Sequence, residues 1–341
     1  MSDKSDYWDS SSQSINFWIY YPNKGAPIAF AALFLISGLW HTYQTLKYKS
    51  SRVTWLYPWA ASIFVAAFIT RAIGAYQRDN LNILIASTVL IYAAPPVYEA
   101  ANCIILGRVL YYIPYHSPLH PGRVLTTYLG IDVLVEALTG VGAPRIANYD
   151  QPYDWRNVGY ILFKVSLCLF VVLIIGFLSV AIYFHRRCLQ AGVLSKDVRT
   201  VLYTLYLSSF FVCVRNLFRL VSIFQSNPVK AAPETFHEPY FWIFEATPML
   251  LNTFLLNIYP PAKYLPRDNK IYLAHDGKTE LRGPGWEDKR FWLWTILDPF
   301  DIAGLVRGRD KETKFWEVGE QQAGIIPIES KTDENRGKEG V

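Results

Sequence analysis

Hydrophobic residues along the chain gather in long runs that short polar connections separate. Between about residue 26 and residue 262 these runs are roughly 20 to 28 residues long, the length that a helix needs to cross about 30 Å of hydrocarbon. Strands of a membrane barrel would give shorter, alternating segments. The pattern therefore predicts an all-α polytopic membrane protein. We expect seven transmembrane helices, at residues 26–46, 54–77, 82–111, 124–143, 157–184, 200–224 and 239–262.

The two ends of the chain are polar and lie outside this helical region. Residues 1–24 are expected to form a disordered extracytoplasmic tail, because they begin with a polar stretch that lacks the features of a signal peptide. Residues 25–265 form the predicted transmembrane domain, and residues 266–341 a cytosolic tail. Within this tail, residues 290–308 mix Trp and Phe with aliphatic residues. That mixture fits a segment in the membrane interface, and it fits a segment that docks on the cytosolic loops equally well.

The basic residues indicate how the helices are oriented. Lys and Arg are enriched in the connections that follow the first, fifth and seventh runs, as at Lys47, Arg186 and Lys263. Because basic loops remain in the cytosol, the amino terminus is predicted to face outward and the carboxyl terminus the cytosol. The tail balances its charges and is not polybasic, so we expect no nucleic-acid partner.

Several predicted helices also carry ionisable residues. Each costs about 2.5 to 3.5 kcal/mol at the centre of a membrane helix, so such residues normally face protein or water. With the amino terminus outside, most of them fall in the outer half of the membrane. That layer comprises Arg71, Lys164, Arg215 and Arg219 on the positive side, and Asp132, Glu136 and Glu245 on the negative side. Their near balance predicts ion pairs around a hydrated cavity.

Two patterns indicate how this layer is built. Asp132 and Glu136 are four residues apart, so they share one face of the fourth helix. In the sixth run, Arg215 and Arg219 continue a polar stripe with two serines, and this stripe is expected to face inward. We expect the two acids to meet the stripe. Two interpretations remain open: the ion pairs only fix the helix register, or they line the headgroup site of an amphiphile whose tails leave between the helices.

Other polar residues carry weaker signals. His41 and Asp132 raise the alternative of an intramembrane zinc hydrolase, but no His-x-x-x-His pair on a helix completes it. The histidines of "HSPLH" have a metal-like spacing, although prolines break the helix that would align them. We therefore expect no metal, no cofactor and no enzymatic activity. Arg108, at the end of the third helix, is expected to reach lipid headgroups.

Five stretches together resemble the RTA-like family of fungal seven-helix proteins, which are also called lipid-translocating exporters. They are "ILGRVL", "TYLGIDVLVEALTGVGA", "FHRR", "LYLSSFFVCVRNLFRLVSIFQ" and "HEPYFWIFEATPMLLNTFLLNIYPP". The resemblance covers about residues 20–265. It implies an outward amino terminus, a cytosolic tail, a plasma-membrane location, and a role in moving or sensing amphiphiles such as sphingoid bases, sterol-like toxicants or porphyrin.

The resemblance also implies which positions matter and where this chain differs. The family positions found here are His41, Arg71, Gly107, Arg108, Asp132, Arg215, Arg219 and Glu238. Glu136 replaces the usual Gln, and Glu245 the usual Asp, so the substrate cannot be copied from relatives. We expect a translocator or exporter of lipids or amphiphilic toxicants that contributes to stress or drug resistance. The alternative is an amphiphile sensor that signals through its cytosolic loops, and a cytosolic partner of the tail is a further expectation.

Overall fold

The computed structural model describes residues 18, 20–50, 54–118, 121–148, 151–225, 238–283 and 316. Within these residues, seven helices are long and apolar enough to cross a membrane, which confirms the predicted all-α fold. The first six are α1 (Gly25–Lys47), α3 (Leu56–Tyr76), α4 (Leu81–Tyr112), α5 (Pro121–Ala147), α6 (Tyr153–Gln190) and α7 (Lys196–Gln225). The seventh combines α8 (Glu238–Phe241), η4 (Trp242–Ala246), α9 (Thr247–Ile258) and α10 (Pro261–Tyr264). The predicted segment 290–308 lies outside the described residues.

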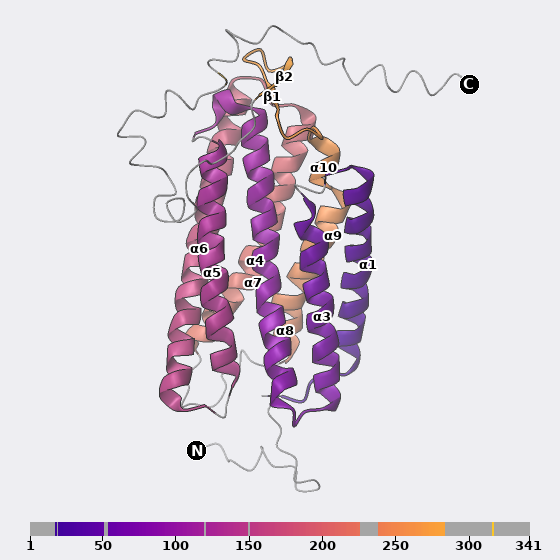
Figure 1. Cartoon of the computed structure of the whole chain (residues 1–341), viewed down its shortest axis with the longest axis vertical. Coiled ribbons are helices and arrows are strands. Elements are labelled where there is room, and N and C mark those ends of the chain that lie inside the picture. The colour runs from indigo at the N-terminus through magenta and orange to yellow at the C-terminus, as the bar shows by residue number, and fades with distance from the viewer. Residues whose placement is uncertain are drawn as a thin grey trace, which may run out of the picture.

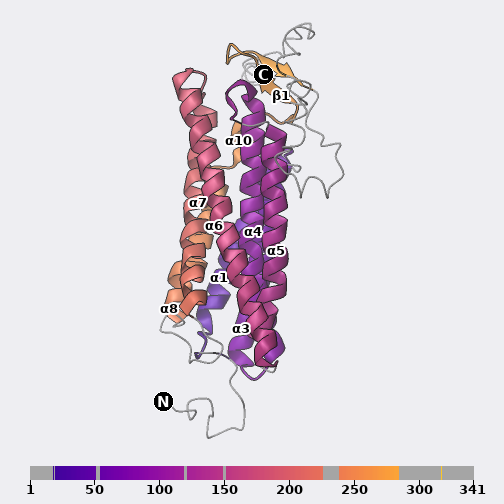
Figure 2. The same cartoon turned by 90° about the vertical axis from the view of Figure 1, so that its left-hand side faces the viewer.

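The helices form a closed bundle in which sequence neighbours also lie side by side. Each helix packs against the next from α1 to α9, α9 returns to α1, and α4 additionally contacts α7 across the bundle (Figures 1 and 2). The short connections favour this antiparallel arrangement. The central position of α4 explains why its apolar residues form no single stripe, since it is covered by protein on several sides.

Large aromatic side chains fill the half of the bundle around α1 and α3. The rings of Phe34 and Phe64 stack with their centroids 4.5 Å apart, and Phe68 and Trp242 extend the stack toward the seventh span. On the opposite side, α5 and α6 approach closely because glycines face each other. A Cβ on Gly159 would lie 2.6 Å from the Cβ of Arg145, so this crossing requires the missing side chain.

A π-helical turn interrupts the seventh span at η4. Pro248 follows it and has no N–H for the carbonyl of residue 244, so the regular α-helical ladder cannot run through this point. Instead, the N–H of Thr247 donates to the carbonyl of Trp242, five residues earlier. The wider turn carries Glu245, which is 1% exposed and faces α7.

A β-hairpin covers the end of the bundle opposite to the start of α1, at the top of Figure 1. Strand β1 (Ile271–Leu273) pairs antiparallel with β2 (Glu280–Arg282), inside the segment 266–341 that the sequence analysis assigned to a cytosolic tail. Gly277 adopts φ +66° in the connection. Oxygens of Asp276 accept hydrogen bonds from the N–H groups of Lys278 and Thr279 and from the Thr279 hydroxyl, which lower the pKa of Asp276 to about 2.

Arg108 fastens the hairpin to the bundle. Its guanidinium donates to the backbone carbonyls of Asp268 at 2.6 Å, Ile271 at 3.1 Å and Asn269 at 3.2 Å. The expectation that Arg108 reaches lipid headgroups is therefore corrected: backbone carbonyls outcompete headgroups because they converge on the end of α4. We call this contact the Arg108 clamp. The neighbouring hydroxyl of Tyr112 donates to the carboxylate of Glu280 at 2.8 Å.

Candidate functional site in the helix bundle

The inward face of α7 carries the polar stripe that the sequence predicts. Ser208, Arg215 and Ser222 are all at most 3% exposed, and Arg219 lies on the same face. Nη2 of Arg215 donates to Oε1 of Glu245 at 3.2 Å, and Arg219 pairs with the other oxygen of the same carboxylate. One carboxylate of the seventh span therefore binds both arginines of the sixth. A buried ion pair of this kind is costly to separate.

Arg71 lies near this pair in a cage of aromatic rings. Its guanidinium carbon is 4.0 Å from the ring centre of Phe241 and 5.2 Å from that of Trp18, and it also faces Trp242. Its Nη2 donates to the hydroxyl of Tyr20. The end of the predicted amino-terminal tail therefore folds back onto the bundle and covers Arg71. Cation–π contacts compensate part of the cost of removing the guanidinium from water.

The charges in this region do not balance. Among the described residues, Arg215 and Arg219 share one carboxylate partner, Glu245, while Arg71 acts electrostatically on Arg219 and forms no ion pair. Lys164, which the sequence placed in the same layer, instead lies over the ring of Phe224 at 5.2 Å. Three guanidinium groups close to one carboxylate leave an excess of positive charge, which favours an anionic group.

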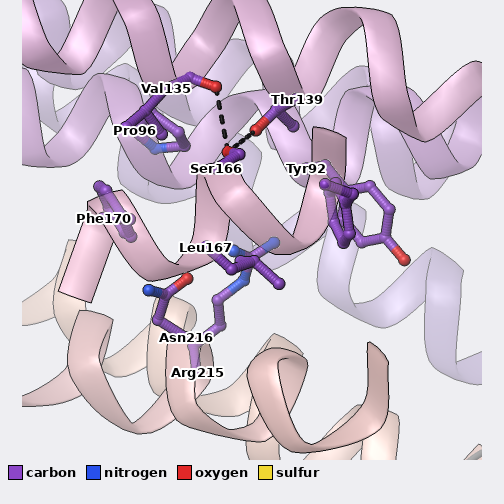
Figure 3. A pocket seen from close by; sticks show the side chains of 10 residues that line it. Tyr92, Pro96, Val135, Thr139, Ser166, Leu167, Phe170, Arg215 and Asn216 are labelled. Carbon is purple, nitrogen blue, oxygen red and sulfur yellow. Dashed lines mark hydrogen bonds between the residues drawn. The ribbon is translucent and has the colours of Figure 1, made fainter. Parts of the chain in front are cut away.

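A small hollow opens beside Arg215, between α4, α5, α6 and α7. Its volume is about 10 Å³, room for about one water molecule, and its lining mixes apolar side chains with a few polar ones. Figure 3 shows Arg215 and Asn216 pointing from α7 toward α6, and the hydroxyls of Thr139 and Ser166 bonded to each other at 2.6 Å. Neither polar atom of the Asn216 side chain has a hydrogen-bond partner in the described structure, although the residue is fully buried. A buried amide without partners is costly, so the wall of the hollow favours a polar group beside Asn216.

The acids of α5 do not meet the arginine stripe, contrary to our expectation. Asp132 is 3% exposed, and the charged groups that act on it are Glu136 and Glu99, not an arginine. Neither Asp132 nor Glu136 forms an ion pair with a described residue, and Oδ1 of Asp132 has no hydrogen-bond partner there. The reason is that the π turn places Glu245 inside the bundle, where its carboxylate pairs with Arg215 and Arg219. Glu136 is only half-buried.

His41 belongs to a second polar cluster, which is organised by Thr253. The hydroxyl oxygen of Thr253 accepts a hydrogen bond from Tyr98 at 2.7 Å and contacts Ser37 at 2.7 Å and Nε2 of His41 at 3.1 Å. This cluster joins α1, α4 and α9. Among the described residues, no three His, Cys, Asp or Glu side chains gather as a metal site would require, and His41 is occupied by a hydroxyl.

The remaining family positions have structural contacts. Gly107 faces α5, where an added Cβ would lie 3.2 Å from the Cβ of Leu125, so a small residue permits the close crossing of α4 and α5. Glu238, at the start of the seventh span, accepts a hydrogen bond from the backbone N–H of Asn23 at 2.7 Å. It thereby ties the segment before α1 to the seventh span.

The sequence analysis did not single out two residues of these sites, Asn216 and Thr253. Asn216 follows Arg215 directly, so a search for amides beside buried charges would have found it. Thr253 offers no such signal. Its hydroxyl matters only because α1 and α4 both present polar side chains to it.

Together, the seven apolar helices and the polar side chains between them define a multi-pass integral membrane protein with a small hollow beside Arg215. The chain belongs to the RTA1-like family, whose model, described as "RTA1 like protein", matches residues 59–268. No solved structure matches the chain significantly.

Named relatives are fungal proteins. The chain is 39% identical to a "Lipid-translocating exporter-like protein RTA1" of Leptosphaeria maculans over 82% of its own length and 57% of the relative, so it spans little more than half of that protein. It is 30% identical to a protein of the same name from Ajellomyces capsulatus, over 73% of this chain and 81% of the relative. It is 21% identical to a "Probable lipid transporter atnI" of Emericella nidulans, over 73% of this chain and 68% of the relative. At the level of the family, these names describe membrane lipid transporters and not enzymes.

Proposed function

We propose that this protein moves an amphiphilic lipid across a membrane and binds its headgroup at Arg215 and Asn216, with the small hollow between the helices widening to admit it. The proposal rests on one observation. Arg215 and Asn216 lie together on the wall of the hollow, and the buried Asn216 side chain has no hydrogen-bond partner among the described residues. A guanidinium offers several donors to an anionic group, and an amide adds a donor and an acceptor for hydroxyls or a phosphate. Phosphorylated sphingoid bases and phospholipids carry these anionic and hydrogen-bonding groups close together in their headgroups.

Glu245 serves as the resting partner of the arginines in this proposal. It occupies Arg215 and Arg219 while no ligand is bound, and an incoming anionic headgroup competes with it for the same guanidinium groups. The excess positive charge that Arg71 contributes favours this exchange. Long-chain tails would leave the hollow between the helices, since the outer faces of the helices are apolar.

The remaining sequence-based roles stay part of the proposal. Glu136, half-buried on α5, is the carboxylate available to an amine in a sphingoid-base headgroup, with Asp132 one turn away, and Lys164 lies toward the lipid side. Export of sterol-like or sphingoid toxicants, stress resistance, a plasma-membrane location and an outward amino terminus also belong to it. The names of the relatives support the transport of lipids in general.

A vesicle assay tests the proposal. The purified full chain is reconstituted into phosphatidylcholine vesicles that contain either a fluorescent sphingosine-1-phosphate or a fluorescent phosphatidylcholine, and an impermeant quencher reports the fraction that changes leaflet. We expect the wild type to accelerate movement, and Arg215→Gln and Asn216→Leu to slow it at least about tenfold, the effect of losing about 1.4 kcal/mol of binding. Arg186→Gln, an exposed arginine at the far end of α6, is the matched control and should keep the wild-type rate. Equal rates in empty and protein-containing vesicles would refute the proposal.

A further inference from the structure

Glu99 and Asp132 are two buried carboxyl groups on adjacent helices in the middle of the bundle. Glu99 is fully buried on α4 and Asp132 is 3% exposed on the adjacent α5. The two groups are close enough to interact electrostatically, and both also act on Cys103. Glu99 lies about 27 Å along α4 from Leu81, at 1.5 Å per residue, which is near the centre of this helix.

The surroundings of the pair offer many acceptors and few donors. Nδ2 of Asn102 donates to Oε2 of Glu99 at 3.5 Å and to Oγ of Ser208 at 2.8 Å. The Oδ1 atom of the same amide has no partner among the described residues, and neither has Oε1 of Glu99 or Oδ1 of Asp132. All three side chains are more than nine-tenths buried. These three buried acceptor oxygens need a hydrogen-bond donor. A carboxyl group that binds a proton becomes such a donor.

No cation of the described chain compensates the pair. The titratable groups that interact electrostatically with Glu99 are acids from four helices: Tyr57 of α3, Cys103 of α4, Tyr128 and Asp132 of α5, and Cys213 of α7. Glu136 acts on Asp132 in the same sense. The basic residues nearby are engaged elsewhere, since Arg215 binds Glu245 and Lys164 of α6 lies over Phe224. Two carboxylates cannot both stay ionised in an apolar interior without a counter-charge.

We propose that Glu99 and Asp132 together bind one exchangeable proton, and that its uptake and release couple lipid movement to a proton gradient. Binding forms one O–H bond on the pair and release breaks it, with no other bond changed. The coupling rests on the proposed transport function, whereas the proton site itself does not. In this proposal the proton gradient is the energy source, because the sequence shows no nucleotide-binding loop.

Difference infrared spectroscopy tests the proton site directly. The full chain in phosphatidylcholine vesicles is examined while the pH is stepped, and the C=O stretching band of a protonated buried carboxyl group is recorded. We expect this band in the wild type, a shift of it in heavy water, and its loss in both Glu99→Gln and Asp132→Asn, since the two groups share one proton. Asp154→Asn, which alters an exposed carboxylate of α6, should leave the band unchanged. A wild type without the band, or a band that survives both pair substitutions, would overturn the proposal.

The vesicle assay with an imposed pH gradient tests the coupling. We expect the gradient to accelerate lipid movement in the wild type and to have no effect in Glu99→Gln. If Glu99→Gln does not fold, Asp132→Asn gives the same comparison, because it removes the other half of the pair. Equal wild-type rates with and without the gradient would overturn the coupling. If no lipid moves in any vesicle while both variants still lose the band, the proposed function fails and the proton site stands.

Discussion

The carboxylate of Glu245 lies 3.2 Å from the guanidinium of Arg215, and both side chains are at most 4% exposed. This contact joins the seventh span to the sixth across the interior of the bundle. It exists because a π turn rotates Glu245 inward, whereas the regular helix after Pro248 presents Met249 and Asn252 to the core. The contact is also the place at which an anionic ligand would compete.

Removing the charge of Glu245 should destabilise the bundle. Glu245→Gln leaves Arg215 and Arg219 buried without a counter-charge, and breaking a buried ion pair costs about 3–5 kcal/mol. We expect a clearly lower melting temperature of the detergent-solubilised protein, measured by intrinsic tryptophan fluorescence. Glu238→Gln, at the half-buried start of the span, should have a smaller effect. A Glu245→Gln variant that melts like the wild type would contradict the role of this ion pair.

The α5–α6 crossing should tolerate no side chain at Gly159. A Cβ there would lie 2.6 Å from the Cβ of Arg145, and overpacking of this kind costs about 1–3 kcal/mol. Gly159→Ala is therefore expected to lower the melting temperature. Gly140→Ala is the matched control on α5, because nothing lies within 4 Å of its added Cβ. The two variants melting alike would show that the helices can separate without cost.

The Thr253 cluster should hold α1, α4 and α9 together. Thr253→Val keeps the shape of the side chain but leaves the groups of Ser37, His41 and Tyr98 without their shared partner. Each buried polar group that loses its partner costs about 1–3 kcal/mol. Denaturation of the purified protein, followed by circular dichroism, measures the loss. Thr42→Val serves as control, since its hydroxyl is exposed and bonds only within α1. No difference between the two would argue against the cluster.

Loss of the Arg108 clamp should release the hairpin. Arg108→Gln removes three charge-assisted hydrogen bonds to the carbonyls of residues 268–271, and each such bond contributes about 1.5–3 kcal/mol. Hydrogen exchange of the amides in β1 and β2, followed by mass spectrometry, is expected to accelerate at least about tenfold. The same measurement on Arg186→Gln, an exposed arginine at this end of the bundle, should match the wild type. Unchanged exchange in Arg108→Gln would mean that other contacts suffice.

The turn of the hairpin should depend on pH only in strong acid. The hydroxyl of Thr279 and two backbone N–H groups bind the ionised form of Asp276, so its folded pKa falls to about 2, below the ordinary value of 3.8. A lowered pKa means that the stabilisation is present above 3.8 and is lost as the pH falls through about 2. Amide exchange at Thr279, measured across this range and corrected for the intrinsic rate, should start to rise as the pH falls below about 3.8 and level off near pH 2. Asp276→Asn should abolish this pH dependence, whereas wild-type exchange that does not change across this range would refute it.

Much of the fold followed from the sequence. The lengths of the apolar runs gave all seven spans, and the period of Ser208, Arg215 and Ser222 predicted an inward stripe on α7, which the structure confirms. The β-hairpin was missed because three-residue strands are too short to show a pattern, although Asp276–Gly277 is a common turn signal.

The partners of the buried charges were harder to predict. The sequence placed Asp132 and Glu136 opposite the arginines, while in the structure Glu245 binds them and Asp132 lies beside Glu99. A π turn changes the direction in which the side chains after it point from the helix. Helix periodicity alone does not reveal where such a turn occurs.

By itself, the sequence determined that this protein crosses a membrane as helices, which faces of those helices are polar, and which family it resembles. Those properties depend on the length and period of apolar runs, and they are local. Only the tertiary structure decided that Arg215 binds Glu245, that Glu99 and Asp132 interact with each other and pair with no cation among the described residues, and that Arg108 holds a hairpin. Each of these depends on the rotation and depth of helices far apart in the chain, which the packing of the whole bundle sets.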